Sequence, residues 1–180
     1  MKRFRDLPWH RVILALIVVT AISLRSEGLF RPLTMHPDES PILEFMENTI
    51  EQGWLKGTTY PGGFFVMAEG ARRISEHVWF RPWQQLLFHL GAVDRPELQL
   101  PPLEFGRVFI ICLSALTVLL IYLLCRQVSG SRAAALFGAT CFAFAAYPIE
   151  HSHYLESDIA MVAMLALSLW LWARYADKPH

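Results

Sequence analysis

The sequence has no excess of charge of either sign and few charged residues. Sixteen Lys and Arg balance sixteen Asp and Glu among 180 residues, and charged residues make up only 18 %. A nucleic-acid-binding surface needs a basic excess to neutralise phosphates, so this balance argues against nucleic acid as a partner. The sequence also lacks internal repeats, low-complexity tracts and the glycine motifs that hold nucleotide phosphates.

Cysteine is scarce, which limits the cross-links and metal sites that the chain can form. The three cysteines, Cys112, Cys125 and Cys141, all lie within or at the end of apolar stretches. No CxxC pair and no Cys/His spacing typical of a metal site is present. We therefore expect packed thiols, and neither disulfides nor a zinc site.

Apolar residues are abundant, at 54 %, and they are concentrated in four blocks, residues 12–24, 108–124, 133–149 and 159–173. A helix needs about 20 residues to cross the hydrocarbon core of a bilayer. The middle two blocks reach only the lower end of this requirement. The outer two need flanking residues, and we expect the charged ends of Arg11, Arg25 and Arg174 to extend toward water.

The four blocks predict an all-α, polytopic membrane protein that forms a single module over residues 1–180. The predicted crossings are about 9–29, 106–125, 132–149 and 158–174, with an outer loop over residues 30–104. The first block also resembles a secretory signal peptide, because Lys2, Arg3 and Arg5 form a basic region before it. The end of this block, Ile22-Ser23-Leu24-Arg25, is not a small-x-small cleavage site, so an uncleaved anchor is favoured over a cleaved signal.

The distribution of basic residues predicts the orientation in the membrane. If each block crosses once, both termini and the 126–132 turn share one side, which holds Lys2, Arg3, Arg5, Arg11, Arg126, Arg132, Arg174 and Lys178. The short loop 150–158 on the other side has no Lys or Arg. This asymmetry predicts cytoplasmic termini in a plasma or inner membrane, with residues 25–107 and 150–158 outside.

The long outer loop contains its own helical patterns. Ser40 and Pro41 form a typical helix start, and apolar residues then recur at helical spacing up to Trp54, which predicts an amphipathic surface helix. Residues 64–90 mix aromatic rings with arginines, a combination that suits the lipid headgroup layer. We expect one or two further interfacial helices there, or a shallow re-entrant segment.

Three groups of polar residues are candidates for chemistry. Asp38 and Glu39 follow His36 in the stretch MHPDES, where Asp38 could act as a general base or the pair could simply cap the next helix. Arg107 could bind a lipid phosphate or extend to water. The 150–158 turn could bind a divalent cation or be merely hydrated, and its candidate ligands are Glu156, His153 and Asp158, beside Glu150 and His151.

HPDES after the first crossing, YPGGFF further along the loop and the stretch from GRVFIICL to LWLWARY together resemble the amino-terminal module of GT-C-type glycosyltransferases. The likeness is to the polyprenyl-phosphate-dependent family of protein O-mannosyltransferases and the lipid A aminoarabinose transferase. It implies Asp38 as general base with Glu39 as its polar neighbour. It also implies Arg107 near the catalytic face, Asp158 at the acceptor or donor site, and His153 without an assigned role.

The resemblance further implies a lipid-linked sugar donor and an acceptor on the outer face of the membrane. Members of the family are several hundred residues long, so we expect either a missing carboxy-terminal half or a partner membrane chain, and no activity from the 180 residues alone. The alternative function is a non-catalytic membrane subunit or a scaffold or transporter-like half. Such a subunit would pair through the small residues Gly138, Ala139 and Ala143.

Overall fold

The computed structural model describes residues 8–27, 62–91, 102–154 and 157–176, and every regular element in these ranges is helical. The elements are α1 (Trp9–Ser26), α3 (Gly62–Ser75), the π-helical segment η2 (Glu76–Phe80), α4 (Arg81–His89), α5 (Pro102–Ser129), α6 (Arg132–Phe144), α7 (Ala146–His151) and α8 (Ser157–Ala176). No strand occurs in the described ranges. The all-α prediction is confirmed.

Three of these helices are long and apolar enough to cross a membrane, over residues Trp9–Ser26, Phe105–Ser129 and Ser157–Ala176. The α6 helix has 13 residues, which at 1.5 Å per residue is about 20 Å against a hydrocarbon core of about 30 Å. After a break at Ala145, α7 continues the chain for six residues. The protein is thus a polytopic membrane protein, and the residues of the predicted third crossing form two separate helices, α6 and α7.

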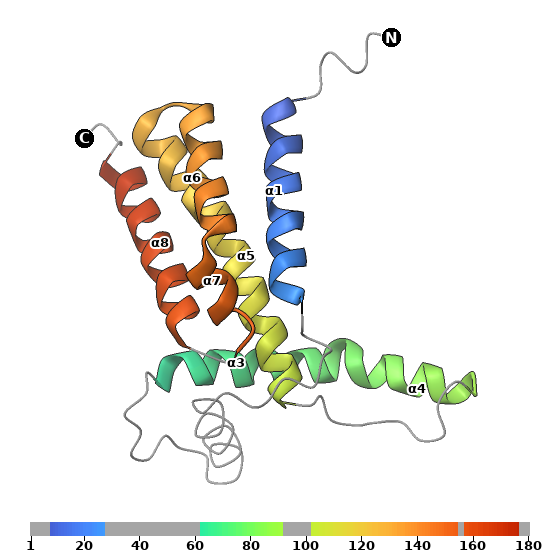
Figure 1. Cartoon of the computed structure of the whole chain (residues 1–180). Helices are drawn as coiled ribbons and strands as arrows, with labels where there is room; N and C mark the ends of the chain where they lie inside the picture. The colour runs from blue at the N-terminus through green and yellow to red at the C-terminus, as the bar shows by residue number, and fades with distance from the viewer. Residues whose placement is uncertain (1–7, 28–61, 92–101, 155–156, 177–180) are drawn as a thin grey trace, which may run out of the picture. The chain divides into compact units, whose positions relative to one another are not determined.

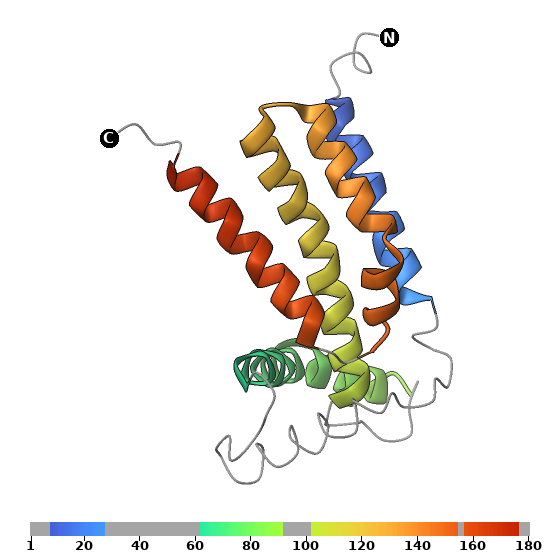
Figure 2. The same ribbon diagram turned by 60° about the vertical axis from the view of Figure 1, so that its left-hand side comes forward.

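The chain divides into two compact units, one formed by residues 1–33 and 110–180 and the other by residues 34–109. The α5 helix begins in the second unit and continues into the first. Within the first unit, α1, α5, α6 and α8 run alongside one another, with α5 between α6 and α8 (Figures 1 and 2).

The core of the first unit lies where α1, α5 and α6 meet. Three alanines of α6, spaced four residues apart, are fully buried there against Ile17 and Ala21 of α1 and Val118 and Tyr122 of α5: Ala135, Ala139 and Ala143. Their small side chains let the helix backbones approach closely. The sequence predicted that Ala139 and Ala143 could pair with a partner chain. In the structure both are covered by contacts within this chain.

A tight turn joins α5 to α6. Gly130 has φ +66°, a left-handed conformation that favours glycine, and its N–H donates to the Arg126 carbonyl at 3.1 Å. Ser131 is the N-cap of α6, because its side chain accepts a hydrogen bond from the Ala134 N–H at 3.4 Å. The sequence Ser-Gly-Ser thus provides one helix end and the next helix start.

In the second unit, an ion network runs along α3, η2 and α4. The Arg72 guanidinium donates to both oxygens of Glu69, at 2.8 and 3.0 Å, and to Glu76 at 2.9 Å. Arg73 donates to Glu69 at 2.7 Å and Arg81 to Glu76 at 3.0 Å. Glu69, Arg72 and Glu76 are buried, so Arg72 serves this network, although the sequence suggested lipid headgroups for the arginines of this segment.

Candidate functional site

The break between α6 and α7 has a local cause in Pro148. A proline lacks the N–H that would bond to the carbonyl four residues earlier, here that of Phe144, and its ring clashes with that carbonyl. Ala145 accordingly leaves the helical conformation with ψ 130°, and α7 begins at the next residue. The last carbonyls of α6 are therefore left without helical partners.

A compact turn follows α7. The N–H of Ser152 donates to the Ile149 carbonyl at 3.2 Å, and the N–H of His153 donates to the Glu150 carbonyl at 3.1 Å. The Ser152 hydroxyl donates to the Pro148 carbonyl, and Ser152 is fully buried. These bonds give His153 a defined place, close to the end of α1.

His153 connects this turn to α1. Its Nε2 atom lies 3.3 Å from the carbonyl oxygen of Leu24. Because a carbonyl can only accept, the contact requires a proton on Nε2. His153 is thereby engaged as a donor, which makes this nitrogen unsuited to binding a metal in the arrangement described.

Asp158 lies in the first turn of α8, at the positive end of the helix dipole. The Tyr147 hydroxyl donates to its Oδ2 atom at 3.1 Å. The Tyr147 ring in turn lies 3.9 Å from the His151 ring, measured between centroids. The carboxylate of Asp158 is thus oriented by a side chain from α7, across the turn.

Arg25 is a feature of this region that the sequence interpretation missed. It was expected to extend toward water, but it is fully buried and donates to Ser114 of α5 and to carbonyls at the end of α6. A signal was present, because Arg25 falls inside the predicted crossing 9–29. Ionised side chains inside membrane segments usually have partners in the protein interior.

The remaining predicted site residues are placed only in part. Arg107 belongs to the second unit and is 5 % exposed. Four others lie outside the described residues: His36, Asp38, Glu39 and Glu156. The predicted convergence of the two acidic patches therefore stays a prediction.

The described side chains contain no group of three or more His, Cys, Asp and Glu residues that could hold a metal ion. Of the three candidate ligands in the outer turn, His153 and Asp158 are described and have the partners given above, and Glu156 is not described. All three cysteines are free, and Cys125 is half-buried, whereas Cys112 and Cys141 are exposed and so are not the packed thiols that the sequence predicted.

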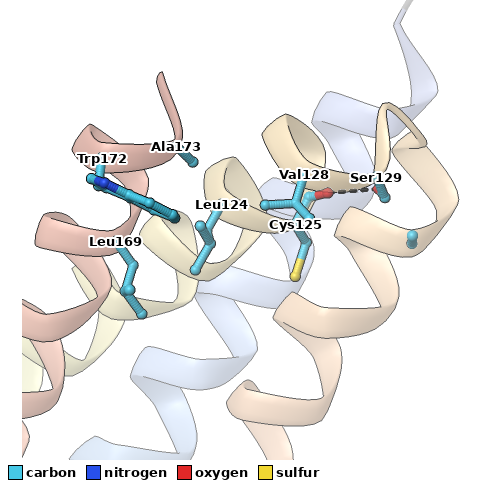
Figure 3. A pocket seen from close by; sticks show the side chains of 8 residues that line it. Leu124, Cys125, Val128, Ser129, Leu169, Trp172 and Ala173 are labelled. Atoms are coloured by element: carbon cyan, nitrogen blue, oxygen red, sulfur yellow. Dashed lines mark hydrogen bonds between the residues drawn. The ribbon is translucent and has the colours of Figure 1, made fainter. Parts of the chain in front are cut away.

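A separate cavity of about 440 Å³ lies between the ends of three helices of the first unit (Figure 3). It is lined by Leu124, Cys125, Val128 and Ser129 of α5, Ala134 of α6, and Leu169, Trp172 and Ala173 of α8. The Ser129 hydroxyl donates to the Cys125 carbonyl at 2.6 Å, so its polarity is satisfied within α5. The cavity is apolar, and none of the predicted site residues lines it.

The comparison with known families supports the resemblance seen in the sequence. Residues 104–180 match the model of the dolichyl-phosphate-mannose-protein mannosyltransferase family. No curated protein and no solved structure matches the chain. The matched segment contains Arg107, His153 and Asp158. It therefore confirms the resemblance to GT-C-type glycosyltransferases and supports a membrane glycosyltransferase as the general class of this protein.

Proposed function

We propose that the protein takes part in the transfer of a sugar from a polyprenyl-phosphate carrier to an acceptor hydroxyl at the outer face of the membrane. The observation that carries this proposal is the family match over residues 104–180, because the family is described by a mannose linked to dolichyl phosphate, which is a polyprenyl-type carrier. The membrane-spanning helices provide the bilayer setting that such a carrier requires.

In the proposed reaction the acceptor oxygen attacks the anomeric carbon and forms the new carbon–oxygen bond. The bond from that carbon to the carrier phosphate breaks, and its electron pair leaves with the phosphate. Asp38 takes the proton of the acceptor hydroxyl as general base, with Glu39 as its polar neighbour, and His36 is proposed to bind the substrate. All three residues lie outside the described ranges, and the roles of Asp38 and Glu39 rest on the resemblance alone.

The phosphate leaves as an anion, so it needs a nearby cation more than a general acid. Arg107 is the residue proposed for this role, because a guanidinium presents two parallel N–H donors that match two phosphate oxygens. Its burial, at 5 % exposed, supports the assignment, since charge interactions are stronger away from bulk water.

Asp158 is proposed to help shape the acceptor or donor site. The hydrogen bond from Tyr147 supports this role by giving the carboxylate one orientation. His153 is proposed to act on the same turn without direct contact with the reacting atoms, because its Nε2 is engaged with the Leu24 carbonyl. A divalent cation at the outer turn stays a prediction, and in the arrangement described it would have to bind without the Nε2 atom of His153.

The test is donor turnover in proteoliposomes that contain the protein with any chain that copurifies with it. Radiolabelled polyprenyl-phosphate sugars are supplied one at a time, and the transferred label and donor binding are both measured. General-base assistance is typically worth about 10²–10⁴-fold, so Asp38→Asn is expected to lower turnover by that factor and leave donor binding unchanged. Glu47→Gln, a carboxylate of the same loop, is the matched control and should retain turnover.

Equal turnover for the native protein and Asp38→Asn would remove Asp38 from the chemistry. Failure of the native protein to bind any lipid-linked sugar would overturn the glycosyltransferase proposal itself. Arg107→Gln is expected to weaken donor binding, because it removes the cation that faces the phosphate.

A further inference from the structure

Arg25 stands at the end of α1 and contacts three helices at once. Its Nε donates to the Ser114 hydroxyl of α5 at 2.7 Å, and its Nη1 donates to the Ala143 carbonyl of α6 at 2.9 Å. The same Nη1 donates to the Ala21 carbonyl one turn earlier in α1 at 3.1 Å, and Nη2 donates to the Phe142 carbonyl at 3.3 Å. The side chain is completely buried.

Among the described residues, this buried cation donates to a hydroxyl and three carbonyls and lies 5.9 Å from the centre of the Phe142 ring, and no carboxylate contacts it. A buried charge without compensation is costly, so the compensation must come from elsewhere. The carboxyl-terminal ends of α1 and α6 both meet at this point, and each carries a partial negative charge. The partial negative charges of the two helix ends therefore compensate the guanidinium charge, as a carboxylate would in an ion pair.

The two α6 carbonyls that Arg25 contacts are those that the break leaves without helical partners. Pro148 prevents the helix from continuing past Phe144, and in the described backbone the Phe142 carbonyl accepts a bond of 3.4 Å from the Ala145 N–H in place of the regular helical bond. An unsatisfied carbonyl inside a membrane protein is costly. The Arg25 side chain donates to these two carbonyls in place of the regular backbone N–H groups.

We propose that Arg25 is a positioning residue, which clamps the break between α6 and α7 and so sets the direction of the outer turn that leads to Asp158. A second contact supports this role, because His153 of that turn lies on the carbonyl of Leu24, the residue before Arg25. Figure 2 shows α7 beside the end of α1, and the two helices are in contact. The turn is thus attached to α1 through adjacent residues.

Other side chains cannot reproduce this clamp. Lysine has a single nitrogen at its tip, so it can contact the α6 carbonyls or Ser114 but cannot span both with fixed geometry. Methionine matches the length and unbranched shape of the arginine stem and removes the charge and all donors. Arg25→Lys and Arg25→Met therefore separate the charge from the forked geometry.

The experiment measures the labelling rate of single cysteines by a small water-soluble thiol reagent, in protein whose native cysteines are replaced by alanine. Ser152→Cys reports on the outer turn and Ala139→Cys on the core of α6, since both positions are fully buried. In Arg25→Met we expect labelling at position 152 to rise at least about tenfold, the effect of losing hydrogen bonds to a charged group. Labelling at position 139 should stay low.

Arg25→Lys is expected to restore part of the protection at position 152. The matched control is Arg11→Met, which removes an exposed arginine from the same helix and should leave both rates unchanged. Unchanged labelling at position 152 in Arg25→Met would overturn the proposal.

A general loss of folding would instead raise labelling at both positions. In that event the same two labelling rates are measured in Ser114→Ala, because this variant keeps the Arg25 charge and removes only its contact with α5. A modest rise at position 152 alone supports the clamp, and a rise at both positions or at neither overturns it. The readout requires no enzymatic activity, so its result is independent of the proposed sugar transfer.

Discussion

At the scale of single residues, Gly138 determines how closely α6 approaches α5. A Cβ atom at this position would lie 2.7 Å from the Cys125 sulfur and 3.6 Å from the Cγ2 atom of Ile121. The first distance is far shorter than a normal carbon–sulfur contact. Only a hydrogen fits between the helices here, as is common where small residues mediate helix packing in membranes.

Gly138→Ala is therefore expected to destabilise the protein, even though alanine has the better helix propensity. Overpacking of this kind typically costs about 1–3 kcal/mol. The measurement is unfolding of the detergent-solubilised protein in mixed micelles of rising denaturing detergent. Because the clash is with one side chain, adding Cys125→Ala should recover most of the loss.

The control for this pair is Cys125→Ala alone, which should change stability less than Gly138→Ala does. Gly70→Ala is a second control, since a Cβ at that helical position meets nothing within 4 Å. A Gly138→Ala protein as stable as the native one would show that the helices separate at little cost.

At the scale of elements, the ion network of α3, η2 and α4 explains the π-helical segment and predicts a pH dependence. Glu76 and Arg81 are five residues apart, the spacing that a π-helical turn brings onto one face. Burial alone would raise the pKa of the Glu69 carboxyl, but hydrogen bonds and charge from Arg72 and Arg73 outweigh it, so the pKa lies below its ordinary value of 4.5.

A carboxyl whose pKa is lowered by folding stabilises the folded state above its unfolded pKa, and this stabilisation is lost as the pH falls through the folded pKa. We therefore expect the helices over residues 62–89 to lose stability as the pH is lowered below about 4.5, the ordinary value. Hydrogen exchange of their amides, corrected for the intrinsic effect of pH, measures this loss.

Glu69→Gln removes the titrating group, so it should reduce protection at neutral pH and flatten the pH dependence. Glu150→Gln, at an exposed position outside the network, is the matched control and should keep the native profile. Identical pH profiles for the native protein and Glu69→Gln would mean that the network contributes nothing to the stability of this segment.

At the scale of the whole molecule, the predicted orientation can be tested at three positions. The charge asymmetry predicts that residues 38 and 157 face the outside and that residue 128, in the last turn of α5, faces the cytoplasm. Single cysteines at these positions, in a background without native cysteines, are labelled with an impermeant reagent in intact cells. Positions 38 and 157 should react at once, and position 128 only after the membrane is permeabilised.

A reaction of positions 38 and 157 from opposite sides would overturn the common active face, and with it the proposed sugar transfer. A reaction of all three positions from outside would instead contradict the crossing of α5. Val128 is a suitable inner reporter because its side chain is 74 % exposed, so protection in intact cells would come from the membrane and not from burial.

The fold class could be predicted from the sequence because membrane spans depend on local apolar length. The blocks 108–124 and 159–173 lie within α5 and α8, and the resemblance to GT-C-type glycosyltransferases is confirmed for residues 104–180. The broken third crossing was also readable in principle, since Pro148 stands four residues after Phe144. The 17-residue block 133–149 nevertheless looked like one span.

The sequence could predict which residues belong to the candidate site, but it could not predict which of them contact one another. Asp158 at a helix start is a local pattern, but its partner Tyr147 comes from another helix. The roles of Asp38, Glu39 and Arg107 stay predictions, because they concern contacts with a donor and an acceptor. Contacts of that kind leave no periodic signal in one sequence.

The sequence by itself determined the helical, membrane-spanning nature of this protein, since the number of consecutive apolar residues and the missing N–H of a proline act over a few positions. Only the tertiary structure decided the use of Arg25 and of the α6 alanines. Arg25 meets partners 89 and 118 residues away, and the alanines pack against α1. Which distant groups compensate a buried charge depends on how the helices pack, and that is a property of the assembled bundle.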